Sequence, residues 1–196
     1  MSEVQIDPKA VKALRDKTNA GMMECKAALL EAKGNLEAAV DILRKKGAAN
    51  AAKKADRETR EGVIAFALAS DNNAASLVEV NCETDFVARN EDFRGFCDRL
   101  AQTVLANPDA DLEPLRQETV TKTGENVTIR RHQRIAVQGS GQIAAYIHQG
   151  SKLGVLVEVG ANKADTLNNP AFKDLVRSLT LQIAAMHPLY VGRSDV

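Results

Sequence analysis

The chain has 196 residues, 44% of them hydrophobic and 27% charged, which is ordinary for a globular protein long enough to bury its own core. Its 26 basic and 26 acidic residues balance, which argues against a general polyanion binder. No apolar run approaches the roughly 20 residues of a membrane helix, and Met1 to Gln5 lack the character of an export signal, so we expect a cytoplasmic protein.

The first 60 residues carry a helical pattern. Three short helices are expected over residues 8–18, 22–33 and 36–47. Asp7 and Asn35 stand at N-cap positions, and Gly34 and Gly47 close the second and third helices. These helices predict a small compact bundle. A solvated helical connector is expected to follow over residues 48–60, with the basic residues Lys53, Lys54, Arg57 and Arg60.

From Gly62 the apolar pattern changes to that of strands. Two hairpins are expected, one pairing residues 63–68 with 76–81 and the other pairing 143–148 with 153–159. Asp71, Asn72 and Asn73 form the turn of the first hairpin. A helix over about 111–122 and a strand over 127–137 separate the two hairpins.

The two hairpins belong to an internal duplication. Leu77–Val80 reappears as Leu156–Val159 (156 − 77 = 79), and the same offset links Asn90 to Asn169, each at the N-cap of an expected amphipathic helix. The apolar stripes are Phe93, Phe96, Cys97, Leu100 and Val104 in the first copy, and Phe172, Leu175, Val176, Leu179 and Ile183 in the second. We expect both helices to bury the same face. The predicted fold class is α+β, with two copies of hairpin plus helix whose sheets share one interior.

One segment of the first copy has no counterpart in the second. Glu83–Val87 aligns with Asn162–Thr166, so the ring of Phe86 is missing from the second copy. Two interpretations stay open: Phe86 packs in its own core with Asp85 as a loop or cap residue, or it projects as a wedge into another protein. A projecting ring could displace side chains in a partner's pocket, while the adjacent acid disfavours bound phosphate.

Other candidate residues are weaker. Met22 and Met23 are adjacent on a helix and cannot both face one core, so one of them is expected to be exposed. Arg15 is better explained as a solvated helix residue, and His148 as a surface or locally bonded histidine, than as functional residues. The basic groups at residues 53–60 and at Arg130, Arg131 and Arg134 could bind phosphate, but acidic residues lie among them and no aromatic platform accompanies them.

Nothing in the sequence requires catalysis or a metal. There is no Gly-rich phosphate loop and no nucleophile elbow. Cys25, Cys82 and Cys97 form no CxxC pair and have no histidine at metal-ligand spacing, so buried free thiols are expected, with no metal and no cofactor.

Four stretches of the chain resemble bacterial elongation factor Ts. They are Leu14–Lys26 (LRDKTNAGMMECK), Lys53–Ala55, Glu79–Val87 (EVNCETDFV) and Gly124–Val127 (GENV). Asn19 stands where the family usually has Gly, and Asn also tolerates a left-handed turn. The resemblance implies a ubiquitin-associated-like (UBA-like) three-helix domain over residues 1–54, with a connector to about 61. It also implies a dimerisation-type α+β core in two subdomains, 62–140 and 141–196. Many members continue beyond the position of Val196 into a coiled-coil hairpin and a C-terminal helix, so the second subdomain is expected to lack that extension.

The resemblance also implies a function, guanine-nucleotide exchange on elongation factor Tu in its GDP-bound or nucleotide-free form. In the family, residues matching Arg15, Met22, Met23 and Lys26 hold the partner's nucleotide-binding domain. Residues matching Thr84, Asp85, Phe86 and Val87 push against helices beside the nucleotide and upset its magnesium ion, and one matching His148 contacts the phosphate-loop side. We expect a binding factor and not an enzyme, with no small-molecule substrate, membrane or nucleic acid as partner. An RNA- or ribosome-associated protein, and an enzyme with a pocket between the repeats, are the alternatives.

Overall fold

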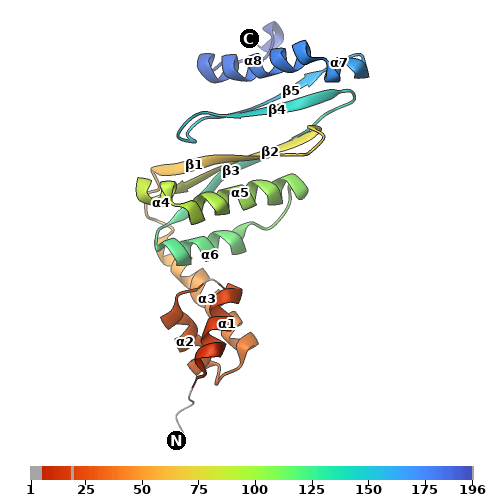
Figure 1. Cartoon of the computed structure of the whole chain (residues 1–196). Coiled ribbons are helices and arrows are strands. Elements are labelled where there is room, and N and C mark those ends of the chain that lie inside the picture. Colours follow the sequence, from red (N-terminus) through yellow and green to blue (C-terminus); the bar gives the residue numbers. More distant parts are fainter. Residues whose placement is uncertain (1–5, 19, 196) are drawn as a thin grey trace, which may run out of the picture.

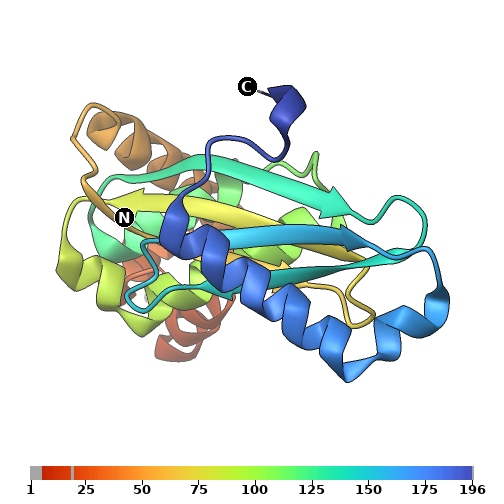
Figure 2. The same cartoon turned by 90° about the horizontal axis from the view of Figure 1, so that it is seen from above.

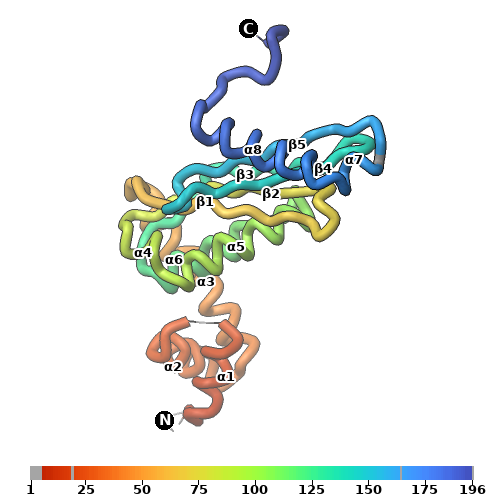
Figure 3. Tube along the Cα trace, turned by 45° about the horizontal axis from the view of Figure 1, so that its top comes forward, coloured from red at the N-terminus to blue at the C-terminus, as the bar shows by residue number. Residues whose placement is uncertain are grey.

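The computed structural model describes residues 6–18 and 20–195, so Asn19 lies outside the described residues. The protein is mixed α and β, with small antiparallel sheets. A helical bundle lies at one end, two stacked sheets form the middle, and the last long helix covers the other end (Figures 1 and 3).

The N-terminal bundle contains α1 (Pro8–Thr18), α2 (Met22–Glu31) and the first half of α3 (Leu36–Lys54). Asp7 and Asn35 act as the predicted caps: the Lys9 N–H donates to Asp7 Oδ1 (2.9 Å), and the Ala38 N–H donates to Asn35 Oδ1 (3.0 Å). A small apolar core joins the three helices, made of Val11, Leu14, Ala20, Cys25, Ala28, Leu29 and Ala39.

The predicted end of the third helix at Gly47 is wrong. Helix α3 continues through Gly47 to Lys54 and absorbs half of the expected connector. Gly47 is buried where α3 crosses α6 (Glu113–Thr123), and a β-carbon there would lie only 3.2 Å from the Thr121 hydroxyl oxygen. The glycine therefore serves a close helix crossing rather than a helix end.

Two antiparallel sheets form the middle of the molecule. The first has the order β1-β2-β3, and the second is the hairpin β4-β5. The bounds are β1 Glu61–Leu68, β2 Ala74–Cys82, β3 Val127–Ala136, β4 Gly141–Ile147 and β5 Gly154–Gly160. Both predicted hairpins, the helix between them and the separate strand are thereby confirmed.

The two sheets lie face to face, as the duplication predicts (Figure 1). The Ile64 N–H donates to the carbonyl of Ser151 (2.7 Å), and the Ile143 N–H donates to that of Asn72 (2.8 Å). A β-carbon at Gly154 would lie 2.7 Å from Ile64, so the strands approach closely at this point.

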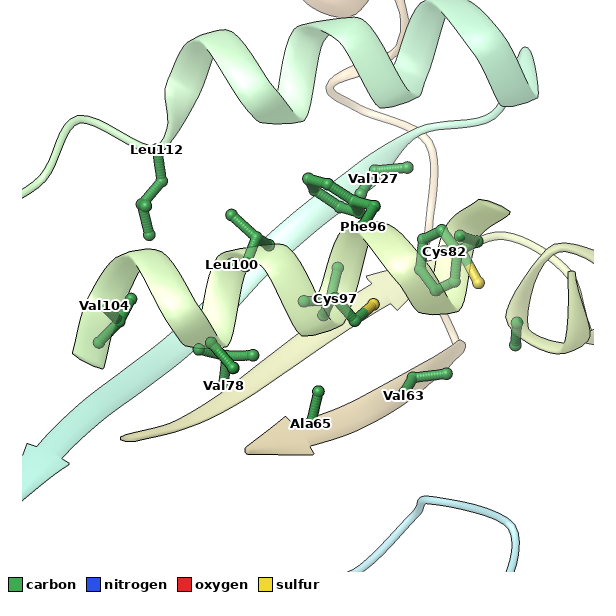
Figure 4. Packing of buried hydrophobic residues seen from close by; sticks show 14 of the residues in the cluster. Val63, Ala65, Val78, Cys82, Phe96, Cys97, Leu100, Val104, Leu112 and Val127 are labelled. Atoms are coloured by element: carbon green, nitrogen blue, oxygen red, sulfur yellow. The ribbon is translucent and has the colours of Figure 1, made fainter. Parts of the chain in front are cut away.

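Helix α5 (Glu91–Ala106) covers the outer face of the first sheet, and α6 packs against α5 and β3. Figure 4 shows Phe96, Cys97 and Leu100 of α5 between the sheet and Leu112, which is one residue before α6. The predicted apolar stripe of α5 is fully buried: Phe93, Phe96, Cys97, Leu100 and Val104 are each at most 1% exposed.

Helix α8 (Pro170–Met186) lies across β4 and β5 in the same way (Figure 2). The prediction that it buries the same face as α5 is only partly right. Val176 is buried, but Leu175 is 54% and Leu179 is 36% exposed, although their counterparts Phe96 and Leu100 are buried. In the first half of the duplication, α6 covers the side of α5 that carries Phe96 and Leu100. After α8, the described residues form only the short 3₁₀ turn Arg193–Asp195.

The claim that the segment around Phe86 has no counterpart is wrong for the backbone. It folds into the five-residue helix α4 (Asp85–Arg89), and α7 (Ala164–Asn168) is an equal helix at the same offset of 79 residues. The fold therefore uses this helix in both halves. The ring, by contrast, is specific to the first copy, because Asp165 stands at the position of Phe86.

Candidate partner-binding site

Helix α4 begins and ends at polar caps. Thr84 is in extended conformation, and its hydroxyl oxygen accepts a hydrogen bond from the Val87 N–H (3.3 Å). Asn90 ends α4 and at once caps α5, accepting from the N–H groups of Asp92 and Phe93. Val87 and Ala88 pack against the core under α5, which fixes the inner face of the short helix.

The outer face of α4 carries the ring. Phe86 is 83% exposed, so the interpretation in which it packs in its own core is wrong. Asp85 is half-buried beside it and forms an ion pair with Arg89 one turn later (3.0 Å between Oδ2 and Nη2). A free phenyl ring next to a carboxylate is thus presented on a helix whose other side is anchored.

A carboxylate from a distant turn holds the start of α4. Glu125, between α6 and β3, accepts hydrogen bonds from the N–H groups of Glu83 and Thr84 (3.0 Å each) and from the Thr84 hydroxyl (2.5 Å). Next to it, the Asn126 N–H donates to the Glu83 carboxylate (2.5 Å). The sequence analysis assigned no role to Glu125 or Asn126. Both lie in the GENV stretch that was quoted for the family resemblance, and this stretch was the sign in the sequence that could have pointed to them.

His148 lies at the same end of the molecule as α4. It begins the β4–β5 turn, is exposed, and its Nδ1 is 2.9 Å from the Tyr146 hydroxyl. In the same turn the Lys152 ammonium binds Glu61 (2.5 Å), which pairs with Cys82 two residues before Thr84. Figure 1 shows this turn and α4 at one edge of the stacked sheets. The structure therefore brings His148 and the Thr84–Val87 segment to one edge.

The other candidate residues lie on the bundle, apart from α4 (Figure 1). Met22 and Met23 are 55% and 75% exposed, so both are free, where only one was expected. Arg15 and Lys26 are exposed as well. Arg15 and Met22 line one hollow together with Thr121 of α6.

The basic groups are largely engaged within the protein. The Arg131 guanidinium lies 2.6 Å and that of Arg130 3.6 Å from the Glu79 carboxylate. Arg134 donates to the carbonyl of Leu105 (2.9 Å), at the end of α5. The Lys54 ammonium donates to the carbonyl of Gly124 (2.7 Å). The groups were expected to be solvated charge, and the exposed side chains of Arg130 and Arg131 agree with that, although both are paired with Glu79.

The three cysteines are buried free thiols, as predicted. Burial raises the pKa of Cys82 to about 11 and that of Cys97 to about 12, because the interior disfavours the thiolate. Within residues 6–18 and 20–195, no cluster of three or more His, Cys, Asp or Glu could hold a metal ion. No helix in that part of the chain is both long and apolar enough to cross a membrane.

Comparison with known proteins places these features in a family. The family model described as Elongation factor TS matches residues 83–196. The chain is 42% identical to an Elongation factor Ts of Clostridium botulinum (strain Eklund 17B / Type B) and 44% identical to one of Clostridioides difficile (strain 630), in each case over 97% of this chain and 66% of the relative. It is 40% identical to that of a Nitratiruptor species, over 95% of this chain and 65% of the relative. The chain thus spans just under two thirds of the length of these relatives. It belongs to the elongation factor Ts family.

Proposed function

We propose that this protein is a guanine-nucleotide exchange factor for elongation factor Tu, which promotes GDP release during translation elongation. In this proposal Asp85 and Phe86 enter the partner beside its nucleotide and magnesium site. The observation that carries it is the 83% exposure of Phe86 on a helix anchored by Val87 and Ala88.

An exposed ring on an anchored helix suits insertion into a partner. Aromatic side chains buried in a partner's pocket are typical of the few residues that dominate binding energy. Because α4 is already held by Thr84 and by the core under α5, little chain entropy would be lost when Phe86 enters. The Asp85 carboxylate would bring negative charge towards the phosphates and compete for the surroundings of the magnesium ion.

Exchange follows from differential binding. If the protein binds nucleotide-free elongation factor Tu better than the GDP complex, then by reciprocity its binding weakens GDP by the same factor. Each tenfold weakening needs about 1.4 kcal/mol of differential contact, which an inserted ring and a displaced ion could supply. No covalent bond is made or broken, so we propose a binding factor and not an enzyme.

A second contact would come from the N-terminal bundle. We assign residues 1–54 to a UBA-like partner-binding unit, in which Arg15, Met22, Met23 and Lys26 grip the nucleotide-binding domain. Exposed methionines suit an adaptable surface because the thioether side chain is flexible and polarisable. The two core subdomains, 62–140 and 141–196, would present α4 and His148 at their common edge.

Release of fluorescent GDP from elongation factor Tu tests the proposal. Wild type should accelerate release, and Phe86→Ala and Asp85→Ala should do so less, with about a tenfold loss for the ring. Leu181→Ala is the matched control, since Leu181 is a 43% exposed apolar residue on α8 and should leave the rate unchanged.

The outcomes separate the candidate functions. No acceleration by wild type would refute the exchange function, and equal acceleration by Phe86→Ala would refute the site. Salt-dependent RNA binding that ignores Phe86→Ala would instead support the RNA-associated alternative.

A further inference from the structure

We propose that Glu125 is a positioning residue, whose carboxylate fixes the start of α4 and thereby the direction in which Phe86 projects. Its effect on nucleotide exchange rests on the proposed function, but its effect on the orientation of Phe86 does not.

The contacts of Glu125 are with the two residues that precede α4, Glu83 and the N-cap residue Thr84. Its Oε2 accepts from two consecutive backbone N–H groups, those of Glu83 and Thr84, and its Oε1 accepts from the Thr84 hydroxyl. The same hydroxyl oxygen accepts from the Val87 N–H. One carboxylate is thus connected through Thr84 to the residue that follows Phe86. Hydrogen bonds to an ionised acceptor are the stronger ones, so the connection is stiff.

Glu125 is itself well fixed. The preceding residue, Gly124, ends α6 in the left-handed conformation (φ 72°), which favours glycine. The following residue, Asn126, is 2% exposed, and its side-chain amide donates to the carbonyls of Ala55 and Arg57 (3.2 and 2.8 Å). The turn therefore ties α4 to α6 and to the segment after α3.

Helix α4 needs such a support because a helix of five residues is far too short to be stable alone. The equal helix α7 has Lys163 at its N-cap position, which makes no side-chain cap hydrogen bond, and carries Asp165 where α4 carries the ring. The carboxylate support therefore occurs at the helix that presents Phe86.

The first experiment measures orientation directly. The chain contains no tryptophan, so Phe86→Trp introduces a single indole on the outer face of α4. Its fluorescence anisotropy decay should show a larger rapid component after Glu125→Ala, and an intermediate one after Glu125→Gln, whose amide oxygen can still accept the two backbone N–H groups.

Glu158→Ala is the matched control for this measurement. The Glu158 carboxylate also accepts a backbone hydrogen bond, from Gln138 (3.0 Å), but in the second half of the duplication. Its removal should leave the anisotropy decay unchanged. An unchanged decay in Glu125→Ala, or an equal change in Glu158→Ala, overturns the proposal.

The second experiment measures exchange. Glu125→Ala should lower the maximal rate of GDP release by about tenfold, with little change in the half-saturating concentration, because the contacts of the bundle are intact. In a Phe86→Ala background the same substitution should have a clearly smaller effect, since it acts mainly through the ring.

The same loss in both backgrounds would mean that Glu125 acts on stability alone and would overturn the proposal. If wild type does not accelerate release at all, the proposed function fails while the anisotropy still decides the role of Glu125. Circular dichroism identifies the variants that are folded, and if Glu125→Ala is not, Glu125→Gln carries both measurements.

Discussion

Phe86 and Asp165 occupy equivalent positions, each the second residue of a five-residue helix and separated by the offset of 79 that relates the two halves. Asp165 is exposed, as expected for an acid on a surface helix, and Phe86 is 83% exposed although it is a large apolar residue. The fold thus contains the same exposed position twice, and one of the two positions carries an aromatic ring. The ring is not needed to form the helix, so we propose that it acts in a contact with a partner.

The first prediction concerns stability at two phenylalanines seven residues apart. Phe86→Ala should change the free energy of unfolding by less than about 0.5 kcal/mol, because the ring is exposed. Phe93→Ala should cost about 3–5 kcal/mol, because Phe93 is 0% exposed in the core under α5. Urea unfolding of both variants is the measurement. A large loss for Phe86→Ala would mean that the ring packs against its own protein.

The second prediction uses another pair related by the duplication. Leu100→Ala should destabilise the protein by about 2–5 kcal/mol, because Leu100 is enclosed between the first sheet and the segment that starts α6. Leu179→Ala, at the equivalent place on α8, should cost only about 1–2 kcal/mol, because Leu179 is 36% exposed. Thermal or urea unfolding compares them directly. Equal losses would show that α8 is covered as completely as α5.

Much of the fold could be predicted because its signals are local. The recurrence of Leu77–Val80 as Leu156–Val159 indicated both hairpins, and Asn90 and Asn169 do cap the two long helices. The end of α3 was wrongly predicted for a physical reason. A glycine that closes a helix and a glycine that lets two helices cross look alike in sequence, and only the contact with Thr121 separates them.

The site was predictable in part. The resemblance singled out Phe86 and its neighbours, but the sequence could not decide between a buried and a projecting ring. The exposure of a side chain depends on which residues pack against it in the folded chain. Glu125 was missed because its bonds to Glu83 and Thr84 join residues 42 and 41 positions apart. Such a contact exists only once the chain is folded and the turn between α6 and β3 lies beside the segment that precedes α4.

The third prediction tests the crossing of α3 and α6. Gly47→Leu should destabilise the protein by about 1–3 kcal/mol, because even a β-carbon would lie 3.2 Å from the Thr121 hydroxyl oxygen. Ala49→Leu is the control, since Ala49 is exposed on the same helix and should shift the stability by no more than about 0.5 kcal/mol. Equal tolerance of both substitutions in urea unfolding would refute the close crossing.

The fourth prediction concerns alkaline pH. The pKa of Cys82 is raised by burial to about 11 and that of Cys97 to about 12, whereas an exposed thiol has a pKa of 9.0. Below about pH 8 folded and unfolded chains both keep these protons, so the contribution of the thiols to stability is fully present. As the pH rises from 9 towards 11, the unfolded chain loses them first, and the free energy of unfolding should fall by about 1.4 kcal/mol per pH unit for each thiol.

Urea unfolding at pH 8 to 10.5 measures this slope, and the variant Cys82→Ala with Cys97→Ala supplies the control. Lysine and tyrosine side chains also titrate in this range, but they are present in both proteins, so the difference between the two slopes isolates the thiols. The variant will be less stable at pH 8 because buried atoms are removed, yet its stability should fall less steeply above pH 9. Parallel slopes would show that the two sulfur atoms reach water in the folded protein, contrary to their 0% exposure.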